Sequence, residues 1–335
     1  MKWRLIPDID LDTVKNCKCL LIGAGSLGCQ VGRNLLAWGV RNITYVDNGK
    51  ISYSNPVRQS LFVFEDCGTD KTKAAIAAER IKAIFPSANA KGENMKIPMP
   101  GHAVETEEGI EEAKSSYEKL EELIKEHDAV FLLTDTRESR WLAAVLSQIY
   151  DKICITAALG FDTYVVLRHG QRYDLHDPIK HGERLGCYFC GDVVAPTNSL
   201  KDRTLDQQCT VSRPALCTIA SAICVELLVS ILNTPDKQAT GAADVLDKCE
   251  RSTLGVVPQQ IRGDLSNWST TCFFGQNFKE CVACSEKVVE SLKKDKFEFV
   301  MQVLNKSNYL EDITGISKMM KEIDEGIVDI IALDE

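Results

Sequence analysis

The sequence predicts a doubly wound α/β protein with a Rossmann-like parallel sheet, and three observations lead to this fold class. An apolar run at residues 18–22 is followed by a turn that reads Gly-Ala-Gly-Ser-Leu-Gly at residues 23–28. A helical pattern then extends to residue 38, and a second short apolar run at residues 42–46 ends at Asp47. A strand, a glycine-rich turn, a helix and a second strand in this order form the first unit of a doubly wound sheet.

The other expected elements follow from periodicity, apolar runs and helix-stopping residues. Helical patterns occupy residues 72–85, 105–127, 139–149 and 215–232, with two more segments from residue 297 onward. Strands are expected at residues 128–134, 153–158 and 163–168. The helix at 215–232 is the longest apolar stretch, but Glu226 interrupts it and Ser and Thr are scattered through it. We therefore expect a buried helix there and no insertion into a membrane.

The composition is that of a globular protein and excludes several classes of function. The chain has 335 residues, of which 44% are apolar and 26% charged, which is enough for a buried core in one large or two modest domains. Its net charge of −9 argues against a nucleic-acid-binding surface, which needs a basic face. No apolar run follows Met1, so no signal peptide is expected. Fourteen cysteines in a chain with ample core indicate reduced thiols and a cytoplasmic location.

Two Cys-x-x-Cys pairs, Cys187/Cys190 and Cys281/Cys284, lie far apart in the chain. Paired turns of this spacing form a tetrahedral four-thiolate zinc site, because each turn presents two sulfurs. A closed thiolate shell has no open position for a substrate, so this zinc is predicted to be structural. The alternatives are two redox dithiols, which are uncommon in one chain, or four small buried side chains.

The glycine turn and Asp47 predict a phosphate-bearing ligand. Gly23, Gly25 and Gly28 let the backbone approach a phosphate at the N-terminus of the following helix, where N–H groups and the helix dipole favour negative charge. Asp47 lies about 20 residues further on, where a carboxylate binds ribose hydroxyls. The alternative is a tight structural turn. These residues alone do not distinguish a dinucleotide from ATP.

The residues that follow this carboxylate favour ATP. Asn55, Arg58 and Gln59 come first, and Lys71 and Lys73 follow them. Several cations are useful to an enzyme that cleaves a triphosphate, since negative charge builds on the leaving pyrophosphate. A solvated basic patch is the alternative, and for Lys71 we prefer it.

Asp135 ends the buried strand at residues 128–134, at the carboxyl edge where doubly wound sheets bind ligands. A carboxylate there can hold Mg²⁺ that bridges phosphates. The alternative is an N-cap for the helix expected from Ser139. Arg137 and Arg140 are either phosphate contacts or surface charges.

A long loop at residues 191–214 carries Cys209, which stands outside the paired cysteines. Polar residues surround Cys209, and Arg213 and a helix start after Pro214 follow it. A helix N-terminus and a nearby cation lower the pKa of a thiol, so Cys209 is the predicted nucleophile. No His lies close by in sequence, so a Cys–His protease dyad is not supported.

Together these residues resemble the E1-like activating enzymes of ubiquitin-like proteins, in the ubiquitin-activating enzyme family. The shared features are Gly-x-Gly-x-x-Gly, Asp47, Asn55-x-x-Arg58-Gln59, Lys73, Asp135, the split zinc cysteines and a Cys-Thr pair in the crossover loop, residues 191–214. The similarity is greatest to the autophagy members of this family and covers essentially the whole chain. It includes residues 3–4, 7–8, 46–49, 53–60, 64–67, 135–141, 157–162 and 202–210.

The resemblance implies an ATP-binding adenylation domain at residues 1–294, which contains the zinc site and the crossover loop. A helical tail at residues 295–335 would dock the ubiquitin-like modifier. ATP and Mg²⁺ would adenylate the C-terminal glycine of the modifier, and Cys209 would then take the modifier as a thioester. Arg58 and Lys73 would neutralise the phosphates, with Asn55, Gln59 and Arg140 in support.

The resemblance also implies a homodimer in the cytoplasm, recruited to the pre-autophagosomal structure. Its partners would be the ubiquitin-like modifiers of autophagy and their conjugating enzymes, which bind a separate N-terminal domain that we expect to be absent here. Two other classes of protein are disfavoured. The basic residues and Cys209 argue against an NAD-dependent dehydrogenase with a structural zinc, and the full set of ATP-binding residues argues against an inactive scaffold subunit.

Overall fold

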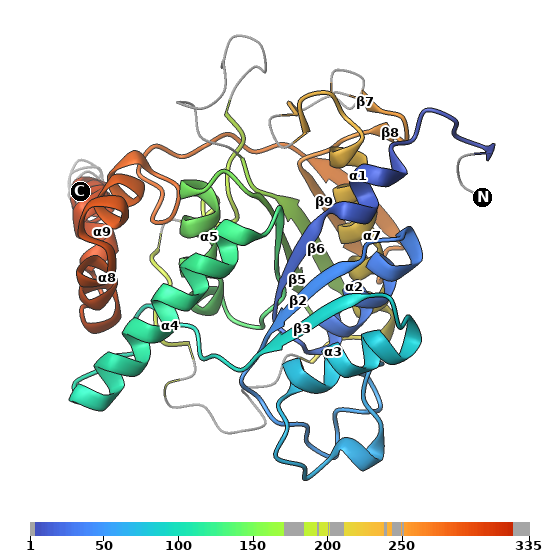
Figure 1. Ribbon diagram of the computed structural model, residues 1–335. Helices are drawn as coiled ribbons and strands as arrows, with labels where there is room; N and C mark the ends of the chain where they lie inside the picture. The colour runs from blue at the N-terminus through green and yellow to red at the C-terminus, as the bar shows by residue number, and fades with distance from the viewer. Residues whose placement is uncertain are drawn as a thin grey trace.

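An eight-stranded sheet runs through the centre of the protein (Figure 1). The computed structural model describes residues 4–170, 184–192, 194–199, 201, 211–237, 240–242, 249 and 251–323. The strands of the sheet lie in the order β10-β9-β6-β5-β4-β1-β2-β3. β3, β2, β1, β4 and β5 are parallel, and β6, β9 and β10 extend the sheet in antiparallel pairs.

The strands of this sheet are β1 (Lys18–Ile22), β2 (Asn42–Val46), β3 (Asn89–Glu93), β4 (Ala129–Leu132), β5 (Ile153–Leu159), β6 (Thr163–Arg168), β9 (Gln260–Asp264) and β10 (Ser269–Phe273). A small hairpin consists of β7 (Arg251–Ser252) and β8 (Gly255–Val256). The helices are α1 (Leu11–Asn16), α2 (Ser26–Trp38), the short η2 (Phe64–Asp66), α3 (Lys73–Ile84), α4 (Glu107–Glu126), α5 (Arg137–Ile149), α7 (Pro214–Leu232), α8 (Glu286–Asn305) and α9 (Tyr309–Thr314).

The predicted α/β fold is confirmed, with a sheet that is mostly rather than wholly parallel. β5 and β6 are joined by residues 160–162 alone, which is too short for the crossover that parallel strands need. β6 therefore turns back, and β9 and β10 follow it in the antiparallel sense. β3, β9 and β10 were not expected, because their sequences contain few apolar residues with a period of two.

Two layers of helices cover the two faces of the sheet. α2, α3 and α7 pack on one face and form a core with β1, β2 and β5. α4 and α5 pack on the other face, and α8 lies outside α5 with α9 against it (Figure 1). The central strands β1 and β4 are therefore buried on both sides, as their apolar sequences require.

α7 is the apolar helix that the sequence places in the core. By length and composition it could cross a membrane, but in the structure it packs against α2, β5 and β6. Its carboxylate, Glu226, accepts a hydrogen bond of 2.7 Å from the indole Nε1 of Trp38. Glu226 lies on the exposed side of the helix, and the prediction of a buried helix is confirmed by the other side.

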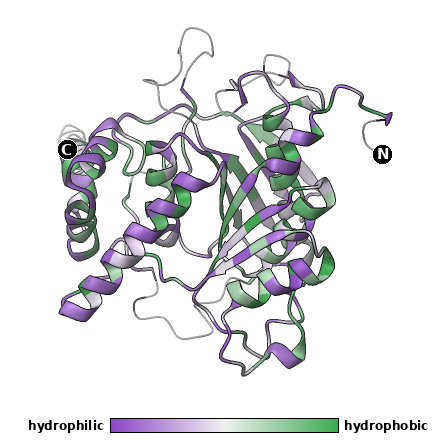
Figure 2. Ribbon diagram, viewed as in Figure 1, coloured by the Kyte–Doolittle hydropathy of each residue, from purple (hydrophilic) through white to green (hydrophobic). Residues whose placement is uncertain are grey.

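α4 is the amphipathic helix expected from its charge pattern. The Thr106 side chain accepts from the Gly109 backbone N–H and caps its start. Tyr117, Leu120 and Ile124 are buried against the core, whereas most of its other residues are hydrophilic, as Figure 2 shows. The helix therefore covers part of one face of the sheet with its apolar side and meets solvent with the other.

α8 begins at Glu286, eleven positions before the helical region expected from residue 297, and its N-cap is Ser285. Helical geometry breaks at Lys296, where φ is 46°. After the break, Phe299 and Val300 are buried in the same core as Trp141. The first part of the expected tail is thus packed on the domain, and α8 crosses the expected boundary at residues 294 and 295.

Candidate functional site

The order of the parallel strands creates a switch point at β1. β2 and β3 lie on one side of β1, and β4 and β5 lie on the other. Doubly wound sheets bind ligands at the carboxyl ends of the strands beside such a switch point. Gly23 follows β1, Asp47 follows β2 and Asp135 lies just beyond β4, so the topology brings three predicted site residues to this edge.

The glycine turn is built so that α2 starts close to β1. Gly23 has a φ of 112°, a conformation that favours glycine, and the backbone of Leu133 passes beside it. A side chain at Gly28 would collide with the carbonyl oxygen of Gly23. Gly25 occupies the N-cap of α2, where no side chain in the described part of the chain caps the helix. The N–H groups of the first turn of α2 are thus available to an anion.

Asp47 holds this turn in place. Its Oδ2 accepts from the Ala24 N–H at 2.8 Å, and its Oδ1 accepts from the Gly49 N–H at 2.7 Å. Each carboxylate oxygen keeps a free lone pair after these bonds, which leaves it able to accept from ribose hydroxyls. The position agrees with the predicted ribose contact and adds a structural role that the sequence did not reveal.

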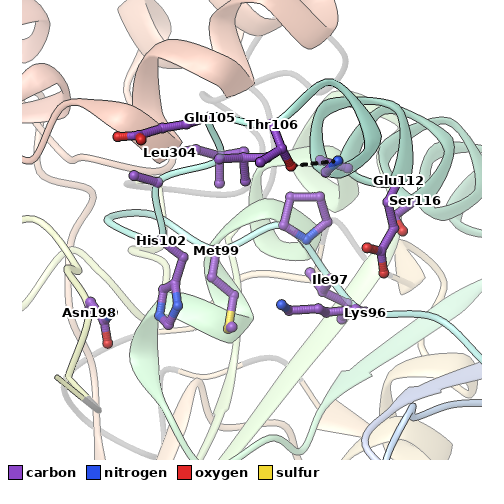
Figure 3. Close-up of a pocket in the computed structure, with 15 residues that line it drawn as sticks. Lys96, Ile97, Met99, His102, Glu105, Thr106, Glu112, Ser116, Asn198 and Leu304 are labelled. Atoms are coloured by element: carbon purple, nitrogen blue, oxygen red, sulfur yellow. Dashed lines mark hydrogen bonds between the residues drawn. The ribbon is translucent and has the colours of Figure 1, made fainter.

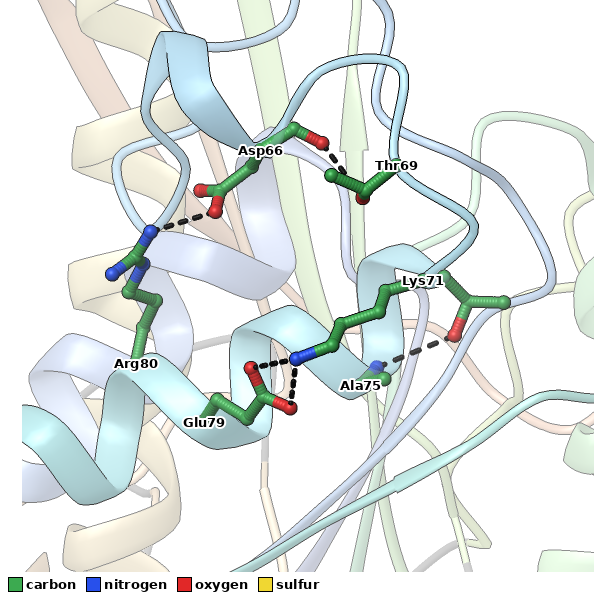
Figure 4. A network of polar contacts seen from close by, with 7 residues as sticks. Asp66, Thr69, Lys71, Ala75, Glu79 and Arg80 are labelled. Atoms are coloured by element: carbon green, nitrogen blue, oxygen red, sulfur yellow. Dashed lines mark hydrogen bonds and ion pairs between the residues drawn. The ribbon is translucent and has the colours of Figure 1, made fainter.

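The two lysines after this carboxylate have different positions. The Lys71 Nζ lies 2.8 and 2.9 Å from the two carboxylate oxygens of Glu79 (Figure 4). This exposed ion pair agrees with the surface interpretation of Lys71. Lys73 begins α3, and its backbone N–H donates to the Gly49 carbonyl at 2.7 Å. That bond places Lys73 beside the turn that Asp47 organises.

Asn55, Arg58 and Gln59 form one turn. The Asn55 carbonyl accepts from the backbone N–H groups of Arg58 and Gln59, at 3.0 and 2.9 Å. Asn55 and Gln59 are buried, and the Gln59 Oε1 has no hydrogen-bond partner among the described residues. Arg58 is exposed, and its Nη1 donates to the Ser54 carbonyl at 3.0 Å. The buried amides thus shape a turn that presents one cation.

Asp135 is where the charges of the site converge. The residue reaches solvent, but the protein around it raises the pKa of its carboxyl by desolvation. Arg140, Lys73 and Arg58 act in the opposite direction, and Asp47 raises the pKa further. All four residues are therefore close enough to interact with this carboxylate. A carboxylate that is costly to ionise in the free protein is stabilised by a divalent cation.

The alternative interpretation of Asp135 as a helix cap is wrong. α5 begins at Arg137, two residues earlier than expected, and Thr136 occupies the N-cap. Asp135 precedes that position, so its side chain is not used to start the helix.

Arg140 lies beside Asp135 but inside the protein. Its side chain is 4% exposed, and its Nε and Nη2 donate to the Thr134 carbonyl at 3.0 and 2.6 Å. Its guanidinium carbon lies 5.0 Å from the centre of the Tyr188 ring. The guanidinium thus contacts two groups of the protein, the Thr134 carbonyl and the Tyr188 ring.

The four paired cysteines come together as predicted. Their sulfurs all lie within 4.8 Å of one another, with 3.6 Å between Cys187 and Cys281 and 3.3 Å between Cys190 and Cys284. Zinc bound tetrahedrally at about 2.3 Å from each sulfur places the sulfurs about 3.8 Å apart. The cluster can therefore hold a metal ion of this kind.

Backbone N–H groups point at these sulfurs. Phe189 donates to the Cys187 Sγ at 3.3 Å, and Phe278 donates to the Cys190 Sγ at 3.4 Å. Hydrogen bonds of this type stabilise thiolates over thiols, which is the form that binds zinc. The donors and the distances both fit a structural zinc site.

We expect the protein to contain one zinc ion that stabilises the fold. Replacing Cys281 and Cys284 by Ser should remove the metal. Thermal unfolding should then become much less cooperative, because folding of such sites depends on the ion. Metal analysis and thermal unfolding measure the two effects. Protein purified without chelators that contained no zinc would contradict the prediction, as would full stability after all four cysteines are replaced.

The crossover loop is fixed to α5 where it begins. The Glu138 side chain is 1% exposed, and its Oε1 accepts from Ser199, at 3.1 Å from the N–H and 2.6 Å from the hydroxyl. Seven residues before Ser199 in the loop, Asp192 pairs with Arg137 of α5 at 2.8 Å. The sequence did not indicate Glu138, because a glutamate in the first turn of a helix is ordinarily a solvated residue.

The end of the same loop is tied to the strand edge. The Arg213 N–H donates to the Phe161 carbonyl at 3.0 Å, and its guanidinium lies 3.4 Å from Asp162. The predicted nucleophile, Cys209, lies between these two attachment points and outside the described residues.

A separate hollow of about 450 Å³ lies beside the start of this loop (Figure 3). Its walls come from residues 96–116, Asn198 and Leu304, with Lys96, His102 and Glu112 among the polar groups. The described residues of the predicted nucleotide site do not line it. The hollow is therefore distinct from the site at the strand ends.

Comparisons with known proteins agree with this arrangement. Residues 1–255 match the model of the ThiF family. The chain is 50% identical over 349 residues to the ubiquitin-like modifier-activating enzyme ATG7 of Homo sapiens, which covers 96% of this chain and 50% of that protein. It is 50% identical over 325 residues to the Komagataella pastoris counterpart, which covers 96% of this chain and 49% of that protein. The chain thus spans about half the length of the curated relatives it matches.

Solved structures show the same fold at much lower identity. The crystal structure of E. coli MccB with ATP matches with a TM-score of 0.55 at 16% identity, over 82% of this chain and 68% of that chain. MccB with MccA-N7isoASN gives a TM-score of 0.56 at 18% identity, over 82% and 69%. At this identity the likeness concerns the fold alone.

Proposed function

This chain belongs to the ThiF family, and on that premise we propose that it carries out adenylation and thioester formation in an E1-like activating enzyme. Its substrates would be ATP and the ubiquitin-like modifiers of autophagy. The single observation that supports this most is that the glycine turn, Asp47 and Asp135 meet at the carboxyl ends of β1, β2 and β4, at the switch point of the sheet.

The first step of the proposed reaction is adenylation. A carboxylate oxygen of the modifier's C-terminal glycine attacks the α-phosphorus of ATP, and the bond to the β-phosphate oxygen breaks to release pyrophosphate. The N-terminus of α2 would hold a phosphate, and Asp47 would bind the ribose. Arg58 and Lys73 would neutralise the charge that builds on the leaving group. Asp135 would hold Mg²⁺ against the phosphates.

The second step forms the thioester. The Cys209 thiolate attacks the acyl carbon of the adenylate, and AMP leaves with the electron pair of the anhydride bond. The described ends of the crossover loop support this assignment, because Glu138 and Asp162 attach the loop at the edge of the sheet where Asp135 lies. Conjugating enzymes would then receive the modifier from this thioester.

Two assays test the proposal directly. Exchange of pyrophosphate into ATP should require both Mg²⁺ and a modifier, and a modifier adduct that reductant removes should form on a non-reducing gel. Neither result is expected of a dehydrogenase or a scaffold. Turnover of NADH without pyrophosphate exchange would overturn the proposal.

We further propose that the C-terminal tail docks the modifier through residues after 323. Leu310 and Ile316 are buried in the domain, so a deletion that starts before them would damage the core. Deletion of residues 324–335 should therefore weaken modifier binding in calorimetry by about tenfold or more while the melting temperature stays unchanged. Unchanged modifier affinity in the shortened chain would show that the tail has no docking role.

The chain is also proposed to form a homodimer. Val57 and Phe64 are exposed on the loop that carries Arg58, and the rings of Tyr53 and Phe64 lie 5.5 Å apart. An apolar group of this kind is typical of an interaction surface. Val57→Glu should shift sedimentation towards the monomer, whereas Trp268→Glu, at an exposed apolar residue elsewhere, should not. If neither variant changes the mass in solution, this surface is not the interface.

We place the protein in the cytoplasm and at the pre-autophagosomal structure. The cysteines of the described residues form no disulfides, which suits a reducing compartment. Imaging of the tagged protein after induction of autophagy tests this location.

A further inference from the structure

Helix α5 lies between the Asp135 carboxylate and the cysteine cluster. Its N-terminus follows Asp135, and two of its consecutive residues contact the two Cys-x-x-Cys turns. Arg140 stacks on Tyr188, which lies between Cys187 and Cys190. On the next position, the Trp141 Nε1 donates to the Val282 carbonyl at 2.8 Å, between the other two cysteines.

The contacts of Arg140 join the two sites. On one side its Nε and Nη2 both donate to the carbonyl of Thr134, the residue directly before Asp135. Two bonds from a planar guanidinium to one carbonyl fix the orientation of the peptide that leads into Asp135.

On the other side, the face of Tyr188 is set by the cysteine turn. The Cys187 N–H donates to the Cys190 Sγ at 3.2 Å, which closes the turn around Tyr188. Phe189 packs edge-on against the Tyr188 ring, with 5.2 Å between ring centres. A guanidinium over an aromatic face is attracted by the ring, and the attraction is larger when the cation is buried, as Arg140 is. Movement of this turn would thus move the guanidinium.

We propose that Arg140 is a positioning residue that sets the Asp135 carboxylate from the cysteine cluster, and that it is not a phosphate ligand. The inference rests on the proposed function, in which Asp135 holds Mg²⁺. It assigns the metal cluster a second effect beyond stability, since the cluster fixes Tyr188 and Tyr188 fixes Arg140. The contacts run from the Cys187–Cys190 turn to the ring of Tyr188, from this ring to the guanidinium of Arg140, and from the guanidinium to the Thr134 carbonyl next to Asp135.

The test is calorimetric titration of the full chain with ATP, with and without Mg²⁺. Arg140→Lys keeps the charge but cannot make the two-pronged bond, and Tyr188→Leu removes the aromatic face. The ratio of ATP affinity with Mg²⁺ to ATP affinity without Mg²⁺ should fall about tenfold or more in both variants. A loss of this size is usual when a residue that orients a metal ligand is changed. Their affinity for ATP without Mg²⁺ should stay the same.

Two control variants separate positioning from general damage. Tyr188→Phe keeps the ring and should restore the wild-type effect of Mg²⁺. Trp141→Phe loses the bond to Val282 on the same cluster, so it should lower the melting temperature without changing the effect of Mg²⁺. Zinc content and thermal unfolding of every variant establish that the fold is intact.

Three outcomes distinguish the possibilities. If Arg140 binds phosphate, Arg140→Lys weakens ATP binding without Mg²⁺ and Tyr188→Leu changes nothing. If both variants respond to Mg²⁺ like the wild type, the positioning role is wrong and the proposed function is untouched. Wild-type protein that binds ATP with Mg²⁺ but exchanges no pyrophosphate contradicts the proposed function, and the same titrations still decide the role of Arg140.

Discussion

Replacing Asp135 by Ala or by Asn is expected to lower pyrophosphate exchange by about 100-fold or more and to leave the melting temperature nearly unchanged. The carboxylate lies beyond β4 at the switch point, and the charges of Arg140, Lys73 and Arg58 favour its ionised form. ATP is negatively charged, so a carboxylate alone would repel it. A divalent cation bound between the carboxylate and the phosphates removes this repulsion. Asn keeps the shape of the side chain without the charge, so the two variants should be equally inactive.

The contrasting result is well defined. If the side chain only supported the start of α5, its loss would cost about 1 kcal/mol of stability and leave exchange nearly normal. Thr136→Ala is the control for local damage, because Thr136 occupies the N-cap position next to Asp135 and its hydroxyl contacts Ser139 Oγ at 3.0 Å without capping a backbone N–H. A stable, active Asp135→Ala protein would remove Asp135 from the metal site.

The parallel part of the fold could be predicted because its pattern is local. β4 is apolar throughout and β1 and β2 are mostly apolar, as strands buried on both faces must be, and the glycine turn marks the first crossover. β3 reads Asn-Ala-Lys-Gly-Glu and is a strand because β2 offers it an open edge. Pairing of that kind depends on tertiary context, so periodicity cannot reveal it.

The candidate site divides in the same way. Residues that act through a motif, such as Asp47 and Lys73, could be named from the sequence. Glu138 and Trp141 could not, because their partners lie 61 and 141 positions away in the chain. Arg140 shows the difference most clearly, since an arginine five residues after Asp135 looks the same in sequence whether it binds a phosphate or a carbonyl.

Replacing Cys209 by Ser is expected to abolish the reductant-sensitive modifier adduct and to preserve pyrophosphate exchange. Adenylation comes first and needs no thiol, so its residues stay complete in this variant. A serine hydroxyl is a much weaker nucleophile than a thiolate, so a slow oxyester that resists reductant is the product to look for. Exchange assays and reducing and non-reducing gels on the same samples measure both steps.

The attachment of the crossover loop makes this separation of steps physically reasonable. Glu138 and Arg213 hold the two ends of the loop through contacts that do not involve the thiol, so the substitution should not disturb the nucleotide site. Cys67→Ser is the control: its thiol is half-buried and lies 3.6 Å from the Ser52 carbonyl, and it should keep full adduct formation. A reductant-sensitive adduct on the Cys209→Ser protein would assign the nucleophile to another cysteine. Loss of exchange in that protein would instead show that Cys209 supports nucleotide binding, and that the two steps share this residue.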